Sequence, residues 1–72
     1  MTRTVYVSMN QKNWIFAYTK RGSTYVALNG KKIGPIQAHL PLEFFDYAKV
    51  VETDAFTGEH VRTEVRRLKW PS

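Results

Sequence analysis

Short alternating segments, separated by turn residues, constrain this chain most. Residues 2–9, TRTVYVSM, place two valines and a methionine on one side and mainly hydroxyl-bearing residues on the other. Residues 14–21, WIFAYTKR, are rich in the aromatic and β-branched residues that favour strands. The polar run NQKN at 10–13 follows the first segment, and Gly22-Ser23 follows the second. Period-two alternation bounded by turn signals predicts strands rather than helices.

Two further hairpins are expected downstream. Asn29-Gly30 is a two-residue signal for a type I′ turn, here between short strands at 25–28 and 31–33. The stretch VVETDAFTGEHVRTEV reads as two strands joined by a DAFTG loop. The last strand is expected at about 59–68.

Residues 41–50 can be read as helix or as strand. Leu42, Phe45 and Lys49 fall at helical spacing, and Pro41 suits a first helical turn. The β-branched residues Val50, Val51 and Thr53 favour a strand instead. We expect a short helical turn at 41–46 and a strand at 47–53.

These segments predict a mainly β fold. The expected architecture is a small five-stranded antiparallel barrel, or a strongly curved sheet, of SH3-like or OB-like type with one short helical turn. Seventy-two residues form one domain, 1–72, and a chain of this length buries only about 60% of its unfolded surface. In a barrel the first and last strands meet, which would bring Arg3 near residues 61–69.

The cysteine content and the hydropathy pattern indicate in which cellular compartment the protein is expected. The chain has no cysteine, which excludes disulfides and cysteine-based zinc sites and suits the cytoplasm. No stretch approaches the roughly 20 apolar residues of a membrane span, and the first residues lack a signal-peptide core. We expect a cytoplasmic protein that does not contact membranes.

No catalytic motif is present. The two histidines, His39 and His60, lack the spaced partners of a metal site. The glycines of GKKIGP lack the Ser/Thr and the strand–loop–helix context of a phosphate-binding loop. We therefore expect a binding protein rather than an enzyme, without cofactor or metal.

The net charge of +5 is unevenly distributed along the chain. Residues 1–42 carry six basic side chains and no acid, residues 43–60 carry five acids against Lys49, and residues 61–72 carry four bases against Glu64. This segmentation predicts a basic side and an acidic side, which would steer charged partners.

The first functional hypothesis is nucleic-acid binding, with RNA or single-stranded DNA favoured over duplex DNA. Small barrels bind single strands by combining a cationic groove with flat side chains on which bases stack. In a regular strand Trp14, Phe16, Tyr18 and Lys20 would share a face. We expect Trp14 and Phe16 in the core, Tyr18 and Tyr25 as exposed stacking residues, and phosphate contacts from the cationic side chains Lys20, Arg21, Lys31, Lys32, Arg62, Arg66 and Arg67.

The C-terminal stretch VRTEVRRLKWPS is central to this hypothesis. We expect Val61, Thr63 and Val65 to point inward, and Arg62, Glu64 and Arg66 outward. Continuing that period would bury Arg67, so the pattern is expected to slip at Arg66-Arg67, by a bulge or by the end of the strand. Leu68 and Trp70 would then turn inward. Such charges equally suit an edge strand that resists aggregation.

The alternative hypothesis is protein binding. A small accessory or inhibitor protein, of the kind phages and plasmids encode, could bind a host protein through oppositely charged faces and the 54–58 loop. Phe56 at the tip of that loop would be the anchor. Opposite-sign faces also suit self-association into a homo-oligomer.

Overall fold

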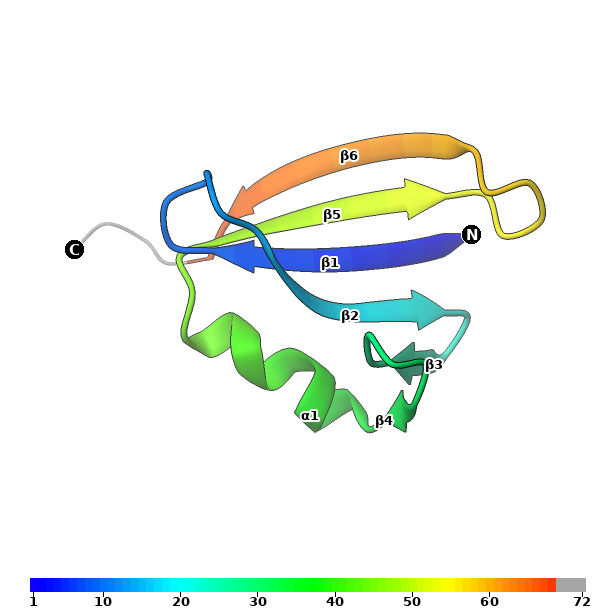
Figure 1. Ribbon diagram of the computed structural model, residues 1–72, viewed down its shortest axis with the longest axis horizontal. Coiled ribbons are helices and arrows are strands. Elements are labelled where there is room, and N and C mark those ends of the chain that lie inside the picture. The colour runs from blue at the N-terminus through cyan, green and yellow to red at the C-terminus, as the bar shows by residue number, and fades with distance from the viewer. Residues whose placement is uncertain (69–72) are drawn as a thin grey trace.

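The computed structural model describes residues 1–68 as one six-stranded antiparallel sheet with a short helical segment on one side (Figure 1). The strand order is β4-β3-β2-β1-β5-β6. The elements are β1 Thr2–Ser8, β2 Ile15–Arg21, β3 Thr24–Val26, β4 Lys32–Ile33, the α-helix α1 Pro35–His39, the 3₁₀ helix η1 Leu40–Glu43, β5 Tyr47–Thr53 and β6 His60–Arg67.

The mainly β prediction is confirmed, and each of the six segments expected as a strand overlaps an observed one, so the sheet has six strands rather than five. The sheet is not closed into a barrel. The first strand, β1, lies in the middle of the sheet between β2 and β5, so β4 and β6 form the two edges. The first and last strands, β1 and β6, do not pair as the barrel prediction expected, and the edge strands β4 and β6 do not pair to close the sheet. The SH3-like or OB-like arrangement is accordingly not confirmed.

The helical segment begins earlier than predicted. Pro35 occupies the first turn of α1, where a missing N–H costs nothing, and the Ala38 N–H donates to the Gly34 carbonyl at 2.9 Å. Pro41 lies in the first turn of η1, in agreement with the prediction for that residue. The chain continues as a 3₁₀ turn through Glu43, and the strand begins at Tyr47, as expected. Within residues 1–68, no helix is long and apolar enough to cross a membrane.

Side chains organise the turns. The buried Ser8 hydroxyl accepts hydrogen bonds from the Asn10 and Gln11 N–H groups, which closes the β1–β2 connection. At the β3–β4 turn Gly30 has a positive φ and Asn29 does not, so the turn is not the predicted type I′. Instead the Gly30 N–H donates to the Ala27 carbonyl, which closes a four-residue turn.

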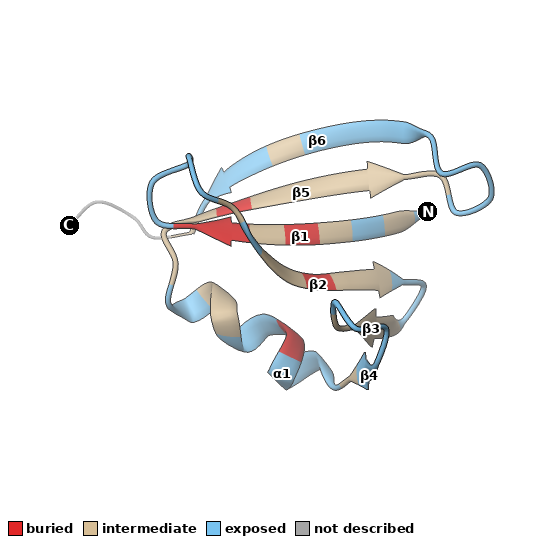
Figure 2. Ribbon diagram, in the orientation of Figure 1, coloured by how far each residue is buried: buried red, intermediate tan, exposed pale blue. Residues whose placement is uncertain are grey.

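The core lies where the helix meets the middle of the sheet. It consists of Val5, Tyr18, Ala38 and Ala48, all buried (Figure 2). Ala38 is fully covered, and a small side chain there lets α1 approach β2 and β3 closely. Around it pack the half-buried Ala17, Tyr25, Ile33, Leu42, Val50 and Leu68.

A bulge in β2 overturns the expectation that Phe16, Tyr18 and Lys20 share a face. Val5 pairs with Tyr18 while Tyr6 pairs with Phe16, which leaves Ala17 as an extra residue without a partner. The bulge turns Phe16 to the face away from the helix, where its ring packs edge-on against Tyr6. Tyr18 turns into the core with only 7% of its surface exposed, so the expectation of an exposed Tyr18 is wrong.

Burial of Tyr18 predicts sensitivity to alkaline pH. Desolvation raises the pKa of its phenol above the usual 10.0, and the neighbouring Tyr25 adds to the effect. Because the folded-state pKa is the higher one, this contribution to stability is complete below about pH 10 and is lost as the pH rises further. Tyr18→Phe should therefore flatten the fall in melting temperature between about pH 9 and 11.5 relative to wild type. Equal slopes for both proteins would contradict this assignment.

Candidate nucleic-acid interface

A groove lies on the helix side of the sheet, where the helix ends and β5 and β6 remain uncovered. We call it the arginine groove, and it encloses about 370 Å³. Its floor is apolar, its wall comes from the helical segment, and its rim is charged. The lining residues are Arg3, Val5, Tyr18, His39, Leu42, Ala48, Val50, Glu52, Arg62, Glu64, Arg66 and Leu68.

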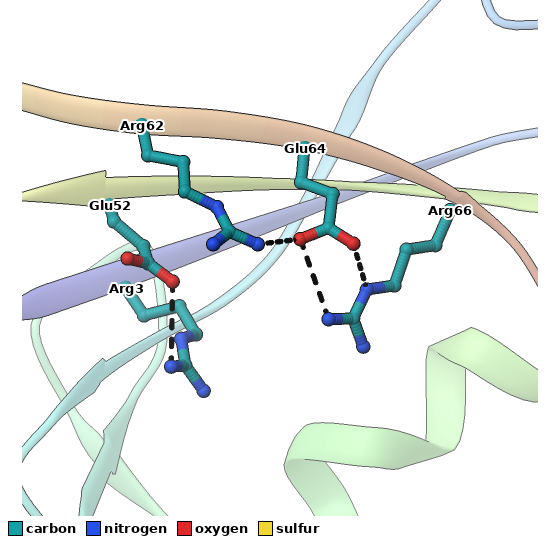
Figure 3. Close-up of polar contacts among 5 residues, drawn as sticks. All are labelled: Arg3, Glu52, Arg62, Glu64 and Arg66. Atoms are coloured by element: carbon teal, nitrogen blue, oxygen red, sulfur yellow. Dashed lines mark hydrogen bonds and ion pairs between the residues drawn. The ribbon is translucent and has the colours of Figure 1, made fainter.

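The strand register assembles the charged rim. Arg3 on β1 pairs with Glu52 on β5, which pairs with Arg62 on β6, so the three side chains form one row across the sheet. Arg62, Glu64 and Arg66 alternate along β6 on the same face. Figure 3 shows all five side chains projecting to one side of the sheet, with Arg66 nearest the helix.

Two glutamates hold the arginines of the rim. Glu64 receives hydrogen bonds from both Arg62 and Arg66, and its Oε1 lies 2.7 Å from the Arg66 Nε. Glu52 lies 3.5 Å from an Arg3 guanidinium nitrogen. The hydrogen bond from Arg66, and to a lesser extent the one from Arg62, holds the pKa of the Glu64 carboxyl below its usual value. The rim keeps one unmatched positive charge, since three arginines face two carboxylates.

The other end of the groove is an aromatic cluster. The three ring centroids are 5.2 Å apart in every pair among Tyr18, Tyr25 and His39. His39 Nδ1 lies 2.7 Å from the Pro35 carbonyl, which can only accept, so Nδ1 carries the proton. The Tyr18 hydroxyl lies 3.5 Å from the other ring nitrogen, Nε2. Lys20 completes the cluster with its Nζ 5.3 Å from the centre of the Tyr25 ring.

The structure divides the predicted phosphate contacts between the two faces. Arg62 and Arg66 line the groove, and Lys20 adjoins it beside Arg3. Strand alternation directs Arg21, Lys32 and Arg67 to the opposite face. Lys31 lies exposed in the β3–β4 turn.

The predicted stacking residues are less accessible than expected. Tyr18 belongs to the core, and Tyr25 is half-buried against it under the Lys20 ammonium. Neither ring offers a free flat face to a base. The physical reason is the shortage of large apolar side chains: the core under α1 is otherwise built from valine and alanine.

The orientation of β6 was predicted the wrong way round. Arg62 and Arg66 share the helix side with the core, while Val65 lies exposed on the far face and Val61 is an exposed residue in a bulge. The helix does not extend over β6, so its charged face needs no burial. There is no bulge at Arg66-Arg67, and of the two expected alternatives it is the end of the strand that occurs there. The strand ends at Arg67, and Leu68 packs against the core as expected. The prediction for Trp70 lies outside the described residues.

Sequence reasoning missed much of the groove. Glu52 was not singled out, Leu42 was considered only as part of a helical turn, and His39 was considered as a candidate metal ligand rather than as part of a groove. Arg3 was expected near β6 by barrel closure, but it reaches the groove because β5 alone separates β1 from β6. The same topology places Glu52 between Arg3 and Arg62, so the expected division into a basic and an acidic side fails there.

The opposite face of the sheet carries a second aromatic group. Lys49 Nζ lies 4.8 Å from the Trp14 ring centre and 5.3 Å from the Tyr6 ring centre. Phe16 packs against Tyr6 at 6.1 Å. Trp14 and Phe16 were expected in the core, yet both are half-buried on this uncovered face. The one ammonium in the group is already directed at two rings.

The comparisons give no relative from which to transfer a function: no protein-family model, curated protein or solved structure matches the chain. Among residues 1–68 no group of three or more histidine or acidic side chains is arranged to hold a metal ion.

The Glu64 bridge can be tested without any ligand. In Arg66→Ala the carboxyl loses the hydrogen bond that contributes most to its low pKa, so that pKa should rise toward its usual value. A titration followed by side-chain carboxyl NMR measures it directly. Arg21→Ala, which removes the same charge from the other face, should leave the Glu64 pKa unchanged. A similar rise in both variants would mean that only net charge matters.

Proposed function

We propose that the protein binds single-stranded nucleic acid, RNA or single-stranded DNA, in the arginine groove. The observation that carries this proposal is the placement of Arg3, Arg62 and Arg66 around an apolar floor on one side of the sheet. Phosphates and bases require that combination of cationic and apolar surface. As the cysteine-free sequence suggests, we place this binding in the cytoplasm.

The dimensions of the groove favour a single strand over a duplex. A volume of about 370 Å³ lies at the low end of the range for ligand pockets, which is too small for a duplex. Duplex readers instead insert a helix or β-ribbon into a groove about 12 Å wide. The helical segment of this protein spans only Pro35 to Glu43 and packs on the sheet through Ala38.

Each part of the groove has a role in the proposal. The guanidinium groups of Arg62 and Arg66 bind phosphates, and Arg3 and Lys20 extend the cationic track toward β2. Bases rest on the half-buried apolar side chains of the groove, Val50 on β5 and Leu68 at the end of β6. We assign stacking to the guanidinium planes, which can stack on bases, rather than to the buried Tyr18.

The two glutamates set the conditions for binding. Glu64 occupies guanidinium donors that a phosphate needs, so a phosphate has to compete with it or use the remaining donors. Arginine has five N–H donors, and Glu64 engages only some of them on each partner. The glutamates thus preorient the arginines but lower the affinity for polyanions.

The proposal predicts the salt dependence of binding. In Arg62→Ala/Arg66→Ala the slope of log affinity against log salt should fall by about 1.4, that is about 0.7 for each lost phosphate contact with a single strand. Fluorescence anisotropy of labelled single-stranded RNA and DNA, at several salt concentrations, measures the slope. The control is Arg21→Ala/Lys32→Ala, which removes the same charge from the opposite face and should change the slope little.

Two outcomes would count against the proposal. Equal loss of slope in both double variants would mean that only the overall charge of +5 attracts the nucleic acid. Binding by the wild type that is seen only at low salt and is equal for RNA, single-stranded DNA and duplex DNA would have the same meaning.

A second candidate function, binding of a protein partner, is favoured by exposed apolar side chains. Phe56, at the tip of the β5–β6 loop, is 98% exposed. The loop around it is fixed, because Asp54 accepts hydrogen bonds from the Phe56 and Thr57 N–H groups. Three further exposed apolar residues follow one another at four-residue spacing along the helical segment and its end: Ile36, Leu40 and Phe44.

This candidate predicts that Phe56→Ala abolishes partner capture while the fold is kept. The side chain contributes almost nothing to the core, so the melting temperature should stay within a few degrees of wild type. Pull-down from a lysate with immobilised wild type and variant provides the comparison, and Leu28→Ala, another highly exposed apolar residue, is the matched control. Capture that survives Phe56→Ala would exclude this anchor.

A further inference from the structure

Among the described residues, 1–68, β6 is a long sheet edge with no neighbour on its outer side. It pairs with β5 alone, whereas the other edge of the sheet is the two-residue β4 (Figure 1). Every residue of β6 except Glu64 is exposed. A strand in this position presents unpaired backbone groups that can pair with another strand.

The hydrogen bonding to β5 determines which residues face outward. The Leu68 N–H donates to the Asp46 carbonyl at 2.7 Å. This hydrogen bond lies two residues along the same antiparallel ladder from the pair Arg66 and Ala48, so both Leu68 and Arg66 direct their backbone groups toward β5. In an antiparallel ladder, residues bonded to one neighbour alternate with residues whose N–H and C=O groups point away. Thr63, Val65 and Arg67 therefore direct their backbone groups to the open edge.

We propose that β6 pairs antiparallel with β6 of a second copy of this chain, about a two-fold axis at Val65. In this register the outward-facing Val65 opposes its own counterpart, and Thr63 opposes Arg67 of the second copy. Glu64 then opposes Arg66 of the second copy, and Arg66 opposes its Glu64. Opposite charges directly across antiparallel strands are stabilising.

The competing registers are less favourable. An axis at Glu64 would place Glu64 against Glu64 and Arg62 against Arg66, and like charges in those positions repel. An axis at Thr63 would pair Val61 with Val65, but the β5–β6 register shifts between Glu52 and Thr53 and leaves Val61 as the extra residue of a bulge. Bulges disrupt pairing at a sheet edge. Only the Val65 register combines opposed charges with the regular part of the strand.

The pairing has consequences for both faces of the sheet. Val65, 47% exposed in the single chain, would be covered by its counterpart on the far face. Because the two-fold axis is perpendicular to the sheet, both arginine grooves would lie on the same side, next to each other. The interface itself does not depend on nucleic acid. It is also small, so we expect weak association, with a dissociation constant on the order of 100 µM.

Sedimentation equilibrium without nucleic acid, at protein concentrations from about 10 to 500 µM, tests the pairing. Wild type should shift from monomer toward dimer over that range. Glu64→Arg alone should remain monomeric, since it opposes arginine to arginine, and Arg66→Glu alone should remain monomeric, since it opposes glutamate to glutamate. An equimolar mixture of the two variants should associate again, because each Arg then faces a Glu. Glu59→Arg and Arg21→Glu make the same charge changes off the edge and should dimerise like wild type.

A wild type that stays monomeric throughout would overturn the proposal. So would single variants that associate like wild type, or a mixture that stays monomeric when wild type dimerises.

An introduced cysteine supplies an independent check, since the chain has none of its own. Val65→Cys should form an intermolecular disulfide under mild oxidation, because paired residues lie about 5.5 Å apart between Cα atoms. Faster cross-linking of Thr63→Cys than of Val65→Cys would contradict the register. None of these readouts involves nucleic acid, so their failure would leave the proposed function untouched.

Discussion

Contact between a nine-residue helical segment and a six-stranded sheet determines the rest of the molecule. Ala38 is fully buried against a core that also contains Val5, Tyr18 and Ala48, and the absence of a larger side chain brings the helix close to the sheet. The segment is too short to cover all the strands, so β5 and β6 keep an open surface on the helix side. That surface is the arginine groove. Its size and position follow from where the helix ends.

The uncovered half of the sheet tolerates charge that a complete core would not. Arg62, Glu64 and Arg66 lie on the same face as the core, yet they remain accessible to water and pair with one another. Exposed ion pairs of this kind add little to stability, and their constraint on geometry is the larger effect. Glu64 and Glu52 fix three guanidinium groups around one groove. The same alternation along β6 makes the outer edge of that strand complementary to itself.

Alternation and turn residues were enough to predict the strands, because each strand has one apolar side. They did not reveal the pairing order, since β1 joins β2 by a local turn but pairs with β5 across the 38 residues between Ser8 and Tyr47. Nor could they reveal the Ala17 bulge, which turns Phe16 and Tyr18 to opposite faces. For the site, Arg62 and Arg66 were predicted as neighbours on one face. Their pairing with Arg3 and Glu52 required the sheet order, and the valines of β6 were assumed to point inward because a closed core was assumed.

Mapping of backbone amide and arginine side-chain NMR signals during titration with a short oligonucleotide, such as a hexamer of uridine, tests the central claim most directly. The groove account predicts that the largest shifts fall on Arg3, Arg62 and Arg66 and on the half-buried floor residues Val50 and Leu68, at about 150 mM salt. Shifts confined to Tyr6, Trp14 and Lys49 would move binding to the opposite face of the sheet. Either that result or the absence of any saturable shift would contradict the account.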